Sequence, residues 1–352
     1  MPPCGIQVFI AATRAVGYVS GMGISGGHAS KLKPTDFIWM DGRLLPFDQA
    51  QVHLLTHTLH YGLGAFEGIR CYKRADGRSA VFRLVDHIDR LFESCHICTM
   101  DIPFTRDDIV RACIDTIRAN KMTEAYIRPI VFLGDGGLGL GSMENPVRVA
   151  VAVYEWGAYL GEEGLRRGIR AKISSFTRGG LNASMSKGKI CGQYVNSVLA
   201  KREAVKAGYS EAILLDDLGH VCEASGENLF IVKKGKLKTA PLSSAILAGI
   251  TRDSIITIAR DLGLTVDEVT FARDELWTAD EVFLCGTAAE LTPVREIDDR
   301  KIGAGECGPI TRRLQEAYFE AVKGKAGSDR IGYPSWLSWL DEPRARVAAL
   351  PA

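Results

Sequence analysis

The sequence predicts a mixed α+β or α/β fold divided into two domains. Short strand-like runs outnumber the helical patterns, and the two kinds of pattern follow no regular alternation. This order excludes a Rossmann sheet and a TIM barrel, in which strands and helices succeed one another regularly. A chain of 352 residues with 46% hydrophobic and 24% charged residues can bury a full core, so whole-chain disorder is also excluded.

The smaller first domain is expected over residues 36–156, where strand and helix patterns mix. Asp41-Gly42 between two strand-like runs is typical of a tight hairpin turn. Apolar residues at helical spacing predict a helix that begins at Leu84. The expected strands are 37–40, 43–47, 66–73, 79–83, 125–133 and 147–154, and the expected helices are 84–100 and 107–120.

Residues 157–168 are rich in turn-forming and charged residues, and we predict the interdomain linker there. The larger second domain is expected over residues 169–345. A loop at 177–190 carries candidate functional residues. The expected strands of this domain are 169–174, 211–215, 228–232, 281–285 and 291–297, and the expected helices are 192–207, 251–262 and 308–323.

Residues 1–35 differ from the rest of the chain. They contain no Asp or Glu, three basic residues and many Gly, Ser and Ala. Two interpretations are open: an organellar targeting leader, or a segment without a targeting role that is either a disordered extension or the result of an upstream start codon. We favour the second, because hydroxyl residues are few for a leader and the basic residues form no amphipathic stripe. The segment is left out of the fold prediction.

Charge and cysteine content narrow the class of protein. A formal net charge of +1 excludes a strongly basic nucleic-acid binder, and no apolar run reaches the roughly 18–20 residues of a membrane span. The nine cysteines are odd in number and lie mostly in apolar stretches, which indicates reduced thiols and a cytoplasmic location. Cys95 and Cys98 are spaced like half of a metal or redox site, but no second half follows. We therefore predict core packing for them and no metal.

Glycines at 134, 136 and 139 follow an apolar strand, as in dinucleotide-binding proteins. Such a site needs a helix directly after the glycines, so that the helix N-terminus meets the pyrophosphate. A turn-like segment at 142–146 follows instead. We therefore predict a flexible loop over a cleft rather than a nucleotide site.

The segment 186–194 contains two lysines, Lys187 and Lys189, among small residues and just before an expected helix. Such a setting disfavours the ammonium form and lowers a lysine pKa, as covalent chemistry on a carbonyl requires. A basic surface loop is the alternative interpretation. Composition alone does not choose between the two lysines.

Two further stretches contain candidate partners for such a lysine. Glu223 is expected at a strand end among small residues, where it either reaches a protonated ring nitrogen or is an ordinary exposed turn acid. Gly249-Ile250-Thr251 begins an expected helix, whose free N–H groups suit an anion; an ordinary capped helix is the alternative. A lysine, an acid and a helix start are together what a pyridoxal phosphate site needs.

Several motifs in one order resemble the branched-chain amino acid aminotransferases, which are pyridoxal-phosphate enzymes of the type IV fold. The likeness runs from about Phe37 to about Trp339. It implies a small N-terminal α/β domain and a larger C-terminal domain with a barrel-like sheet. The matching stretches are LHYG at 59–62, FEGIRCY at 66–72, YIRP at 126–129, WGAYLG at 156–161, the lysine loop, GENLF at 226–230, GITR at 249–252 and GTAAE at 286–290.

The resemblance also implies which residues hold pyridoxal 5′-phosphate. In the family the catalytic lysine lies five residues before a tyrosine, which selects Lys189 and makes Lys187 a bystander. Glu223 is implied to accept the pyridine N–H, Tyr194 to bind the ring O3′ and Arg90 to bind the phosphate. The other implied cofactor contacts are Leu247 on the ring and Ile250, Thr251 and Thr287 at the phosphate.

For the substrates, the resemblance implies transamination of L-leucine, L-isoleucine and L-valine with 2-oxoglutarate by a ping-pong mechanism. Arg128 matches the arginine that meets the distal carboxylate of glutamate or 2-oxoglutarate, and Thr287 and Ala288 match the α-carboxylate site. Tyr61 matches a residue supplied by the partner subunit, so a homodimer or a higher homo-oligomer is implied. The implied pocket aromatics are Phe66, Tyr126, Trp156 and Tyr194.

Three alternatives are open at this point. The nearest is a D-amino acid transaminase or an aminodeoxychorismate lyase of the same fold, but the stretches 126–129 and 156–159 favour the L-branched-chain group. The second is a dinucleotide-dependent oxidoreductase built on the glycines at 134–139. The third is a catalytically silent binding protein, which the intact set of Lys189, Tyr194 and Glu223 disfavours.

Overall fold

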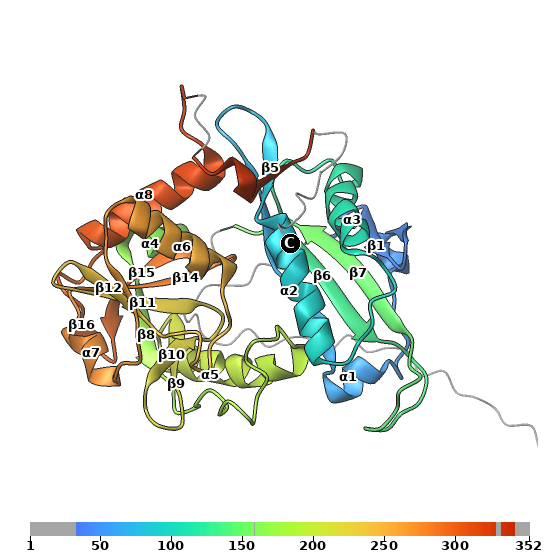
Figure 1. Cartoon of the computed structure of the whole chain (residues 1–352), viewed down its shortest axis with the longest axis horizontal. Helices are drawn as coiled ribbons and strands as arrows, with labels where there is room; N and C mark the ends of the chain where they lie inside the picture. Colours follow the sequence, from blue (N-terminus) through green and yellow to red (C-terminus); the bar gives the residue numbers. More distant parts are fainter. Residues whose placement is uncertain (1–32, 158, 329–331, 342–352) are drawn as a thin grey trace, which may run out of the picture.

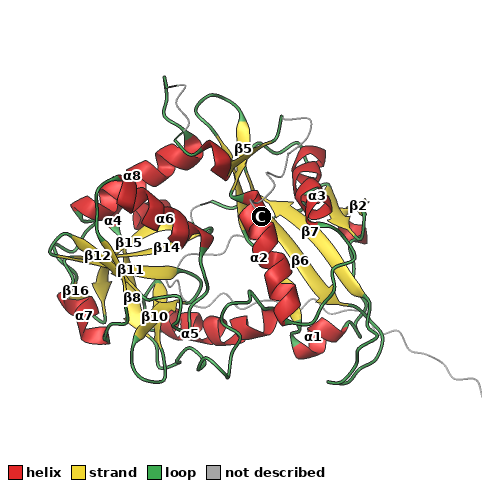
Figure 2. Ribbon diagram, in the orientation of Figure 1, coloured by secondary structure: helices red, strands yellow, loops and turns green. Residues whose placement is uncertain are grey.

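The computed structural model describes residues 33–157, 159–328 and 332–341. In this part of the chain two β-sheets lie next to each other, each with its own helices (Figure 1). Helices and strands mix in both halves, as Figure 2 shows, which confirms the predicted fold class. Residues 1–32, most of the segment interpreted as a leader or an extension, lie outside the described residues.

The first sheet contains eight strands, and its pairings are antiparallel. The strands lie in the order β17-β5-β4-β6-β7-β1-β2, with β3 beside β6. β6 and β7 form the longest ladder, at the residues where strands are predicted. The bounds are β1 Phe37–Met40, β2 Arg43–Pro46, β3 Gly64–Phe66, β4 Ile69–Lys73, β5 Ser79–Phe82, β6 Ala125–Leu133, β7 Val147–Tyr154 and β17 Leu337–Trp339.

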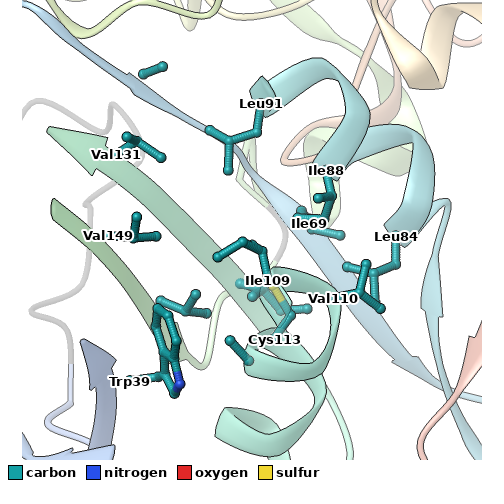
Figure 3. Close-up of a cluster of buried hydrophobic side chains, with 14 of the residues drawn as sticks. Trp39, Ile69, Leu84, Ile88, Leu91, Ile109, Val110, Cys113, Val131 and Val149 are labelled. Carbon is teal, nitrogen blue, oxygen red and sulfur yellow. The ribbon is translucent and has the colours of Figure 1, made fainter. Parts of the chain in front are cut away.

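Two helices cover one face of this sheet (Figure 1). Their apolar residues recur at helical spacing, so one stripe of each helix faces the strands. Figure 3 shows Leu84 and Ile88 of the first helix and Ile109 of the second among buried side chains of the sheet. This packing fixes the position of the first helix, α2, relative to the sheet. The helical segments of this half are η1 Phe47–Gln49, α1 His57–Tyr61, α2 Leu84–Ile97 and α3 Arg106–Ala119.

Six strands of the second sheet close into a barrel. The order β10-β9-β8-β15-β14-β11 is closed by pairing between β11 and β10, which confirms the barrel-like sheet expected in the larger domain. β12 and β13 extend the sheet from β11, and β16 pairs with β15. The bounds are β8 Ile169–Ile173, β9 Glu211–Leu215, β10 Val221–Ala224, β11 Asn228–Lys233, β12 Lys236–Thr239, β13 Val266–Glu268, β14 Glu281–Gly286, β15 Glu290–Ile297 and β16 Arg300–Lys301.

Helices α4 to α8 lie around this barrel (Figure 1). A buried cluster joins α6 and α8 to the sheet, with the rings of Phe230 and Phe283 stacked at 5.0 Å between centroids. None of the described helices is long and apolar enough to cross a membrane. The bounds are α4 Glu162–Arg167, η2 Cys191–Gln193, α5 Tyr194–Lys206, α6 Ile250–Asp261, α7 Arg273–Thr278, α8 Pro309–Lys323 and η3 Pro334–Trp336.

Some elements differ from the predicted ones. The segment 157–168, predicted as a linker, contains helix α4. β17 pairs with β5 of the first sheet, although residues 169–345 are predicted as the second domain; the domain division otherwise stays a prediction. The strand predicted over 66–73 is divided into β3 and β4. The sequence pattern also misses α1, β10, β12, β13, α7, β16 and β17. These elements are too short for hydrophobic periodicity to distinguish them from turns.

Candidate active site

The lysine loop lies where the two sheets meet. The backbone N–H of Lys189 donates to Oγ of Ser94 on α2 at 2.9 Å. Its carbonyl accepts from the backbone N–H of Phe66 on β3 at 3.1 Å, and Ile190 forms a β-bridge with Ala65. The loop is therefore anchored to the first sheet and to α2, which excludes the interpretation as a free basic surface loop.

The two lysines have different surroundings. The Nζ of Lys189 lies 2.6 Å from the hydroxyl oxygen of Tyr194. The Nζ of Lys187 instead donates to the carbonyl oxygens of Ser244 and Ile246, at 2.8 and 2.9 Å. Burial lowers the pKa of Lys187. Lys187 is thus more than a bystander, because it ties down the chain segment in front of helix α6.

Glu223 lies on β10 at a shift in register with β9, an irregularity of the kind that re-aims side chains. Its Oε1 pairs with Arg178 at 2.5 Å, and its Oε2 accepts from the backbone N–H of Leu247 at 3.1 Å and from Nδ2 of Asn228 at 3.2 Å. Burial raises the pKa of Glu223, and the charge of Arg178 and the N–H of Leu247 oppose that rise. A carboxylate has about four acceptor positions, so this buried group retains one for a ring N–H.

A buried carboxylate, Glu67, holds Arg90 in place. The Nε and Nη2 of Arg90 donate to Oε1 and Oε2 of Glu67 at 2.7 and 2.9 Å, and Nδ1 of His87 lies 2.7 Å from Oε2. Burial by itself would raise the pKa of Glu67, but the charges of Arg90 and His87 hold it well below its usual range. Nη1 of Arg90 donates to the carbonyl of Ala248 at 2.8 Å. A guanidinium has five donors, so two N–H groups of Arg90 remain for an anion.

Helix α6 begins after Gly249, and no side chain caps it. The N–H groups of its first turn have no partner inside the helix, and the helix dipole adds partial positive charge. Glycine is required at 249, because a Cβ there would lie 1.9 Å from Oδ1 of Asn228. Thr251 is buried in this turn and adds a hydroxyl. With Arg90 beside Ala248, this end of the site suits a phosphate.

A pocket between these groups has the donor set that pyridoxal phosphate needs. The amine of Lys189 can react with the aldehyde, and the buried carboxylate of Glu223 can accept a hydrogen bond from the ring nitrogen. The start of α6 and the guanidinium of Arg90 can bind the phosphate. All of the residues predicted to contact the cofactor line this pocket: Arg90, Lys189, Tyr194, Glu223, Leu247, Ile250, Thr251 and Thr287.

Residues predicted to contact the substrate lie on two sides of the site. Thr287 and Ala288 line the same pocket at the β14–β15 turn, together with Tyr126 of β6. The ring of Tyr126 lies 4.6 Å from that of Trp156, between centroids. Trp156 itself lines a neighbouring groove between the two sheets. The rings thus form a wall that continues out of the pocket.

Phe66 links the lysine to the predicted substrate arginine. Its ring centroid lies 4.8 Å from that of Tyr194 and 5.0 Å from Nζ of Lys189. The Cζ of Arg128 lies 4.8 Å from the same centroid. Tyr61 lies on α1 and is 46% exposed. Neither Tyr61 nor Phe66 nor Arg128 is among the residues that line the cofactor pocket of the described chain. The contribution of Tyr61 to a partner subunit stays a prediction.

Four residues at the site were not predicted as site residues from the sequence: Glu67, Arg178, Glu227 and Asn228. Glu67, Glu227 and Asn228 lie inside the FEGIRCY and GENLF stretches, and Arg178 lies in the 177–190 loop. Burial, together with the charge of the neighbouring Glu211, raises the pKa of Glu227. The motifs that contain these residues were the only sequence signal for them. Nothing in the neighbouring sequence shows that the charged side chains among them are buried.

The other motifs have structural uses. No helix follows the glycines at 134–139, since residues 140–146 are loop and turn. A Cβ on Gly137 would lie 2.5 Å from Oγ of Ser142, so this glycine permits close packing within the loop. The geometry does not support a dinucleotide site there. Cys95 and Cys98 are buried in the core beside the first sheet, as predicted.

Comparisons with known proteins agree with this geometry. The family model "Amino-transferase class IV" matches residues 64–297. This chain belongs to the class IV aminotransferases. The aminotransferase is 51% identical to the branched-chain-amino-acid aminotransferase of Pseudomonas aeruginosa, over 82% of this chain and 93% of that relative. It is 44% identical to the enzyme of that name from Escherichia coli K12, over 88% of this chain and 98% of the relative.

Solved structures give the same result. The Escherichia coli branched-chain amino acid aminotransferase superposes with a TM-score of 0.83 at 44% identity, covering 87% of this chain and 100% of that one. A second solved branched-chain amino acid aminotransferase, which contains pyridoxamine 5′-phosphate, superposes with a TM-score of 0.84 at 46% identity. The match covers 88% of this chain and 100% of that one. The resemblance stated from the motifs is confirmed. The aminotransferase uses pyridoxal phosphate and transaminates branched-chain amino acids, and the oxidoreductase hypothesis is wrong.

Proposed function

We propose that this aminotransferase moves the amino group of L-leucine, L-isoleucine or L-valine to 2-oxoglutarate, which gives a branched-chain 2-oxo acid and L-glutamate. One site must then accept an apolar side chain in one half-reaction and a carboxylate-bearing side chain in the other. The course is ping-pong, because the first product leaves before the second substrate binds. The observation that carries the proposal is the surroundings of Arg128.

Arg128 is a cation whose surroundings in the described part of the chain are aromatic rather than acidic. Its Cζ lies 4.8 Å from the ring centroid of Phe66 and 5.4 Å from that of Tyr126, and its Nε has no hydrogen-bond partner there. The groups that raise the pKa of Arg128 against its burial are tyrosines. A guanidinium that pairs with no carboxylate among the described residues suits the distal carboxylate of 2-oxoglutarate or glutamate.

The aromatic side chains at the site also suit a branched aliphatic side chain of the substrate. Phe66 offers ring surface next to Lys189, Tyr126 lines the same pocket as the lysine, and the ring of Trp156 continues from that of Tyr126. An apolar pocket separates side chains that differ by one methylene by only about 1–3 kcal/mol, so we expect all three branched-chain amino acids to react. The backbone N–H groups of Thr287 and Ala288, at the turn lining the pocket, are suited to the α-carboxylate that every substrate shares.

The proposed roles follow from position. When bound, pyridoxal phosphate supplies an aldehyde and an electron-withdrawing ring that weakens the Cα–H bond of the substrate. Lys189 provides the amine, and its Nζ takes and returns the Cα proton with the Tyr194 hydroxyl as its partner at 2.6 Å. Glu223 holds a proton on the ring nitrogen. Arg90 and the first turn of α6 hold the phosphate.

Replacing Arg128 with methionine tests the dual-substrate proposal. We expect the KM for 2-oxoglutarate to rise about 100-fold, because a charge pair with the distal carboxylate is lost, and the KM for L-leucine to stay close to the wild-type value. Steady-state kinetics with each substrate varied in turn measures both. Arg148→Met is the control, since Arg148 also lies over a ring, that of Phe132, on the neighbouring strand β7. Equal changes for both substrates, or none for 2-oxoglutarate, would contradict the proposal.

We also propose a homodimer in which Tyr61 completes the partner's pocket. Apolar side chains are exposed around α1 and on the 134–146 loop, and Nε2 of His57 lies 3.1 Å from the carbonyl of Gly139, which joins the two segments. Monomeric proteins rarely expose so much apolar surface in one area, so a second copy is the expected cover. The exposed residues are Leu44, Phe47, Val52, Leu54, Leu55, Leu59, Leu138, Leu140 and Met143.

Sedimentation equilibrium tests this part of the proposal. The wild type is expected to give twice the chain mass of 38.3 kDa. Leu54→Asp should weaken association, because it places a charge in the expected contact. Leu218→Asp is the matched control, since Leu218 is 78% exposed against 76% for Leu54 but lies on the β9–β10 turn. A single-chain mass for the wild type, or equal effects of both variants, would contradict the assignment.

We also propose that the aminotransferase is located in the cytoplasm. The curated relatives cited above are bacterial enzymes. Every cysteine of the described part of the chain is a free thiol, and burial raises the pKa of Cys71, Cys95 and Cys222 to about 12. Reduced, unreactive thiols of this kind are typical of a reducing compartment.

A further inference from the structure

We infer that Arg70 and Glu290 form a positioning pair that holds the aromatic wall of the substrate site against the turn that binds the substrate carboxylate. Neither residue belongs to the lining of the cofactor pocket in the described chain. The inference rests on the proposed role of Thr287 and Ala288 in binding the α-carboxylate.

Arg70 lies on β4 of the first sheet and reaches across to the second. Its Nη1 lies 3.0 Å from Oε1 of Glu290 on β15, with the two side chains 10% and 3% exposed. Its Nη2 donates to the carbonyls of Trp156 at 3.4 Å and Gly157 at 3.1 Å. One guanidinium therefore joins β4, the segment that follows β7, and β15.

Glu290 closes the turn between β14 and β15. It pairs with Gly286 across the ladder, which leaves Thr287 and Ala288 in the turn itself. The φ of Glu290 is +55°, in the left-handed region that disfavours residues other than glycine unless neighbouring contacts hold them. The ion pair with Arg70 is such a contact. The conformation of the turn is thus coupled to a charge on the other sheet.

The pair lies between two hollows of the molecule. Arg70, Trp156 and Glu290 line a groove of about 1240 Å³ between the sheets. Thr287, in the turn that Glu290 closes, lines the cofactor pocket, as does Tyr126, whose ring lies 4.6 Å from that of Trp156. Loss of the pair would therefore release the turn and the aromatic wall together.

The chemistry of the two groups fits this role. A planar guanidinium has donors in several directions, so Arg70 donates to two carbonyls while its charge also faces Glu290. The contact with Oε1 of Glu290 is an ion pair rather than a hydrogen bond. Removing one member of a buried pair leaves the other charge uncompensated. Glu290→Gln is therefore expected to loosen the turn, and Arg70→Lys to keep part of the contact.

Rapid kinetics on the holoenzyme tests the inference. The half-reaction with L-leucine, followed by the visible band of the cofactor, gives an apparent dissociation constant and a limiting rate separately. We expect Glu290→Gln to raise the dissociation constant at least about tenfold, because small displacements of substrate-positioning groups have large effects. The limiting rate should change less, and the band before leucine is added should not move, because Lys189, Tyr194 and Glu223 are unchanged. Arg70→Lys should fall between wild type and Glu290→Gln.

Two further variants separate the possible outcomes. Glu296→Gln is the matched control, since Glu296 lies on the same strand β15 and pairs with Arg170 at 2.5 Å. If Glu290→Gln and Arg70→Lys leave the dissociation constant unchanged, or Glu296→Gln raises it equally, the positioning pair is wrong. Ala288→Pro removes one N–H of the turn. If that variant also binds leucine normally, the carboxylate site itself is wrong; if only Ala288→Pro weakens binding, the carboxylate site stands and the pair does not. Should Glu290→Gln not fold, Arg70→Lys carries the same test.

Discussion

Replacing Lys189 with alanine is expected to lower turnover with L-leucine and 2-oxoglutarate by about 10⁴-fold or more. In the proposed roles, the variant loses both the amine that bonds to the cofactor and the group that carries the Cα proton. The fold should persist, because Lys189 contacts Ser94 and Phe66 through its backbone. Steady-state kinetics measures the loss, and a small primary amine added to the variant should restore part of the rate by replacing the missing Nζ.

Lys187→Met is the matched control in the same loop. The Nζ of Lys187 binds the carbonyls of Ser244 and Ile246, and the next residue, Leu247, donates its N–H to Glu223. We therefore expect lower thermal stability and weaker cofactor binding, with the proton transfer itself retained. Borohydride reduction followed by peptide mapping should label Lys189. A label on Lys187, or an equal loss of turnover in both variants, would show that the lysine assignment is wrong.

Long elements were predictable from the sequence because their patterns repeat. β6 and β7 lie at the residues where strands are predicted, and α6 begins one residue before its predicted start. Short elements gave no such signal. β10 is only four residues long, yet it carries Glu223, and its pairing with β11 closes the barrel. A closed barrel is a property of pairing between strands distant in sequence, and here only the family resemblance implied it.

The candidate site could be predicted in part. The motifs identified the lysine loop, the acid and the helix start, and the resemblance then selected Lys189 over Lys187. What the sequence left out are the ion pairs that orient these groups. Glu67 and Arg178 each resemble ordinary surface charges in the sequence, and only the folded chain brings them to Arg90 and Glu223. Because these charges are buried against Arg90 and Glu223, they can hold those side chains in position. The sequence around a single charged residue does not show whether that residue is buried.

Replacing Glu223 with glutamine is expected to lower turnover by about 100-fold or more at every pH at which the protein stays folded. A neutral amide cannot stabilise a proton on the ring nitrogen, and the ring then withdraws electrons less strongly from Cα. Oε2 of residue 223 accepts from the N–H of Leu247 and from Nδ2 of Asn228, and the amide oxygen of glutamine can accept from both, so the side chain should keep most of its position. Turnover together with the visible band of the bound cofactor measures the effect.

Arg178→Met should give a graded form of the same defect, and its pH dependence distinguishes charge from structure. In the proposed role Glu223 acts as a carboxylate, so activity is expected to fall as the pH falls through its pKa. Burial raises that pKa, and Arg178 at 2.5 Å is the largest influence that opposes the rise. Without Arg178 the pKa of Glu223 rises further, and the loss of activity on the acid side begins at a higher pH. Arg170→Met, which removes an arginine from another ion pair of the barrel, should leave the profile in place. If Arg178→Met lowers activity equally at all pH values, its role is to support the loop rather than to tune Glu223.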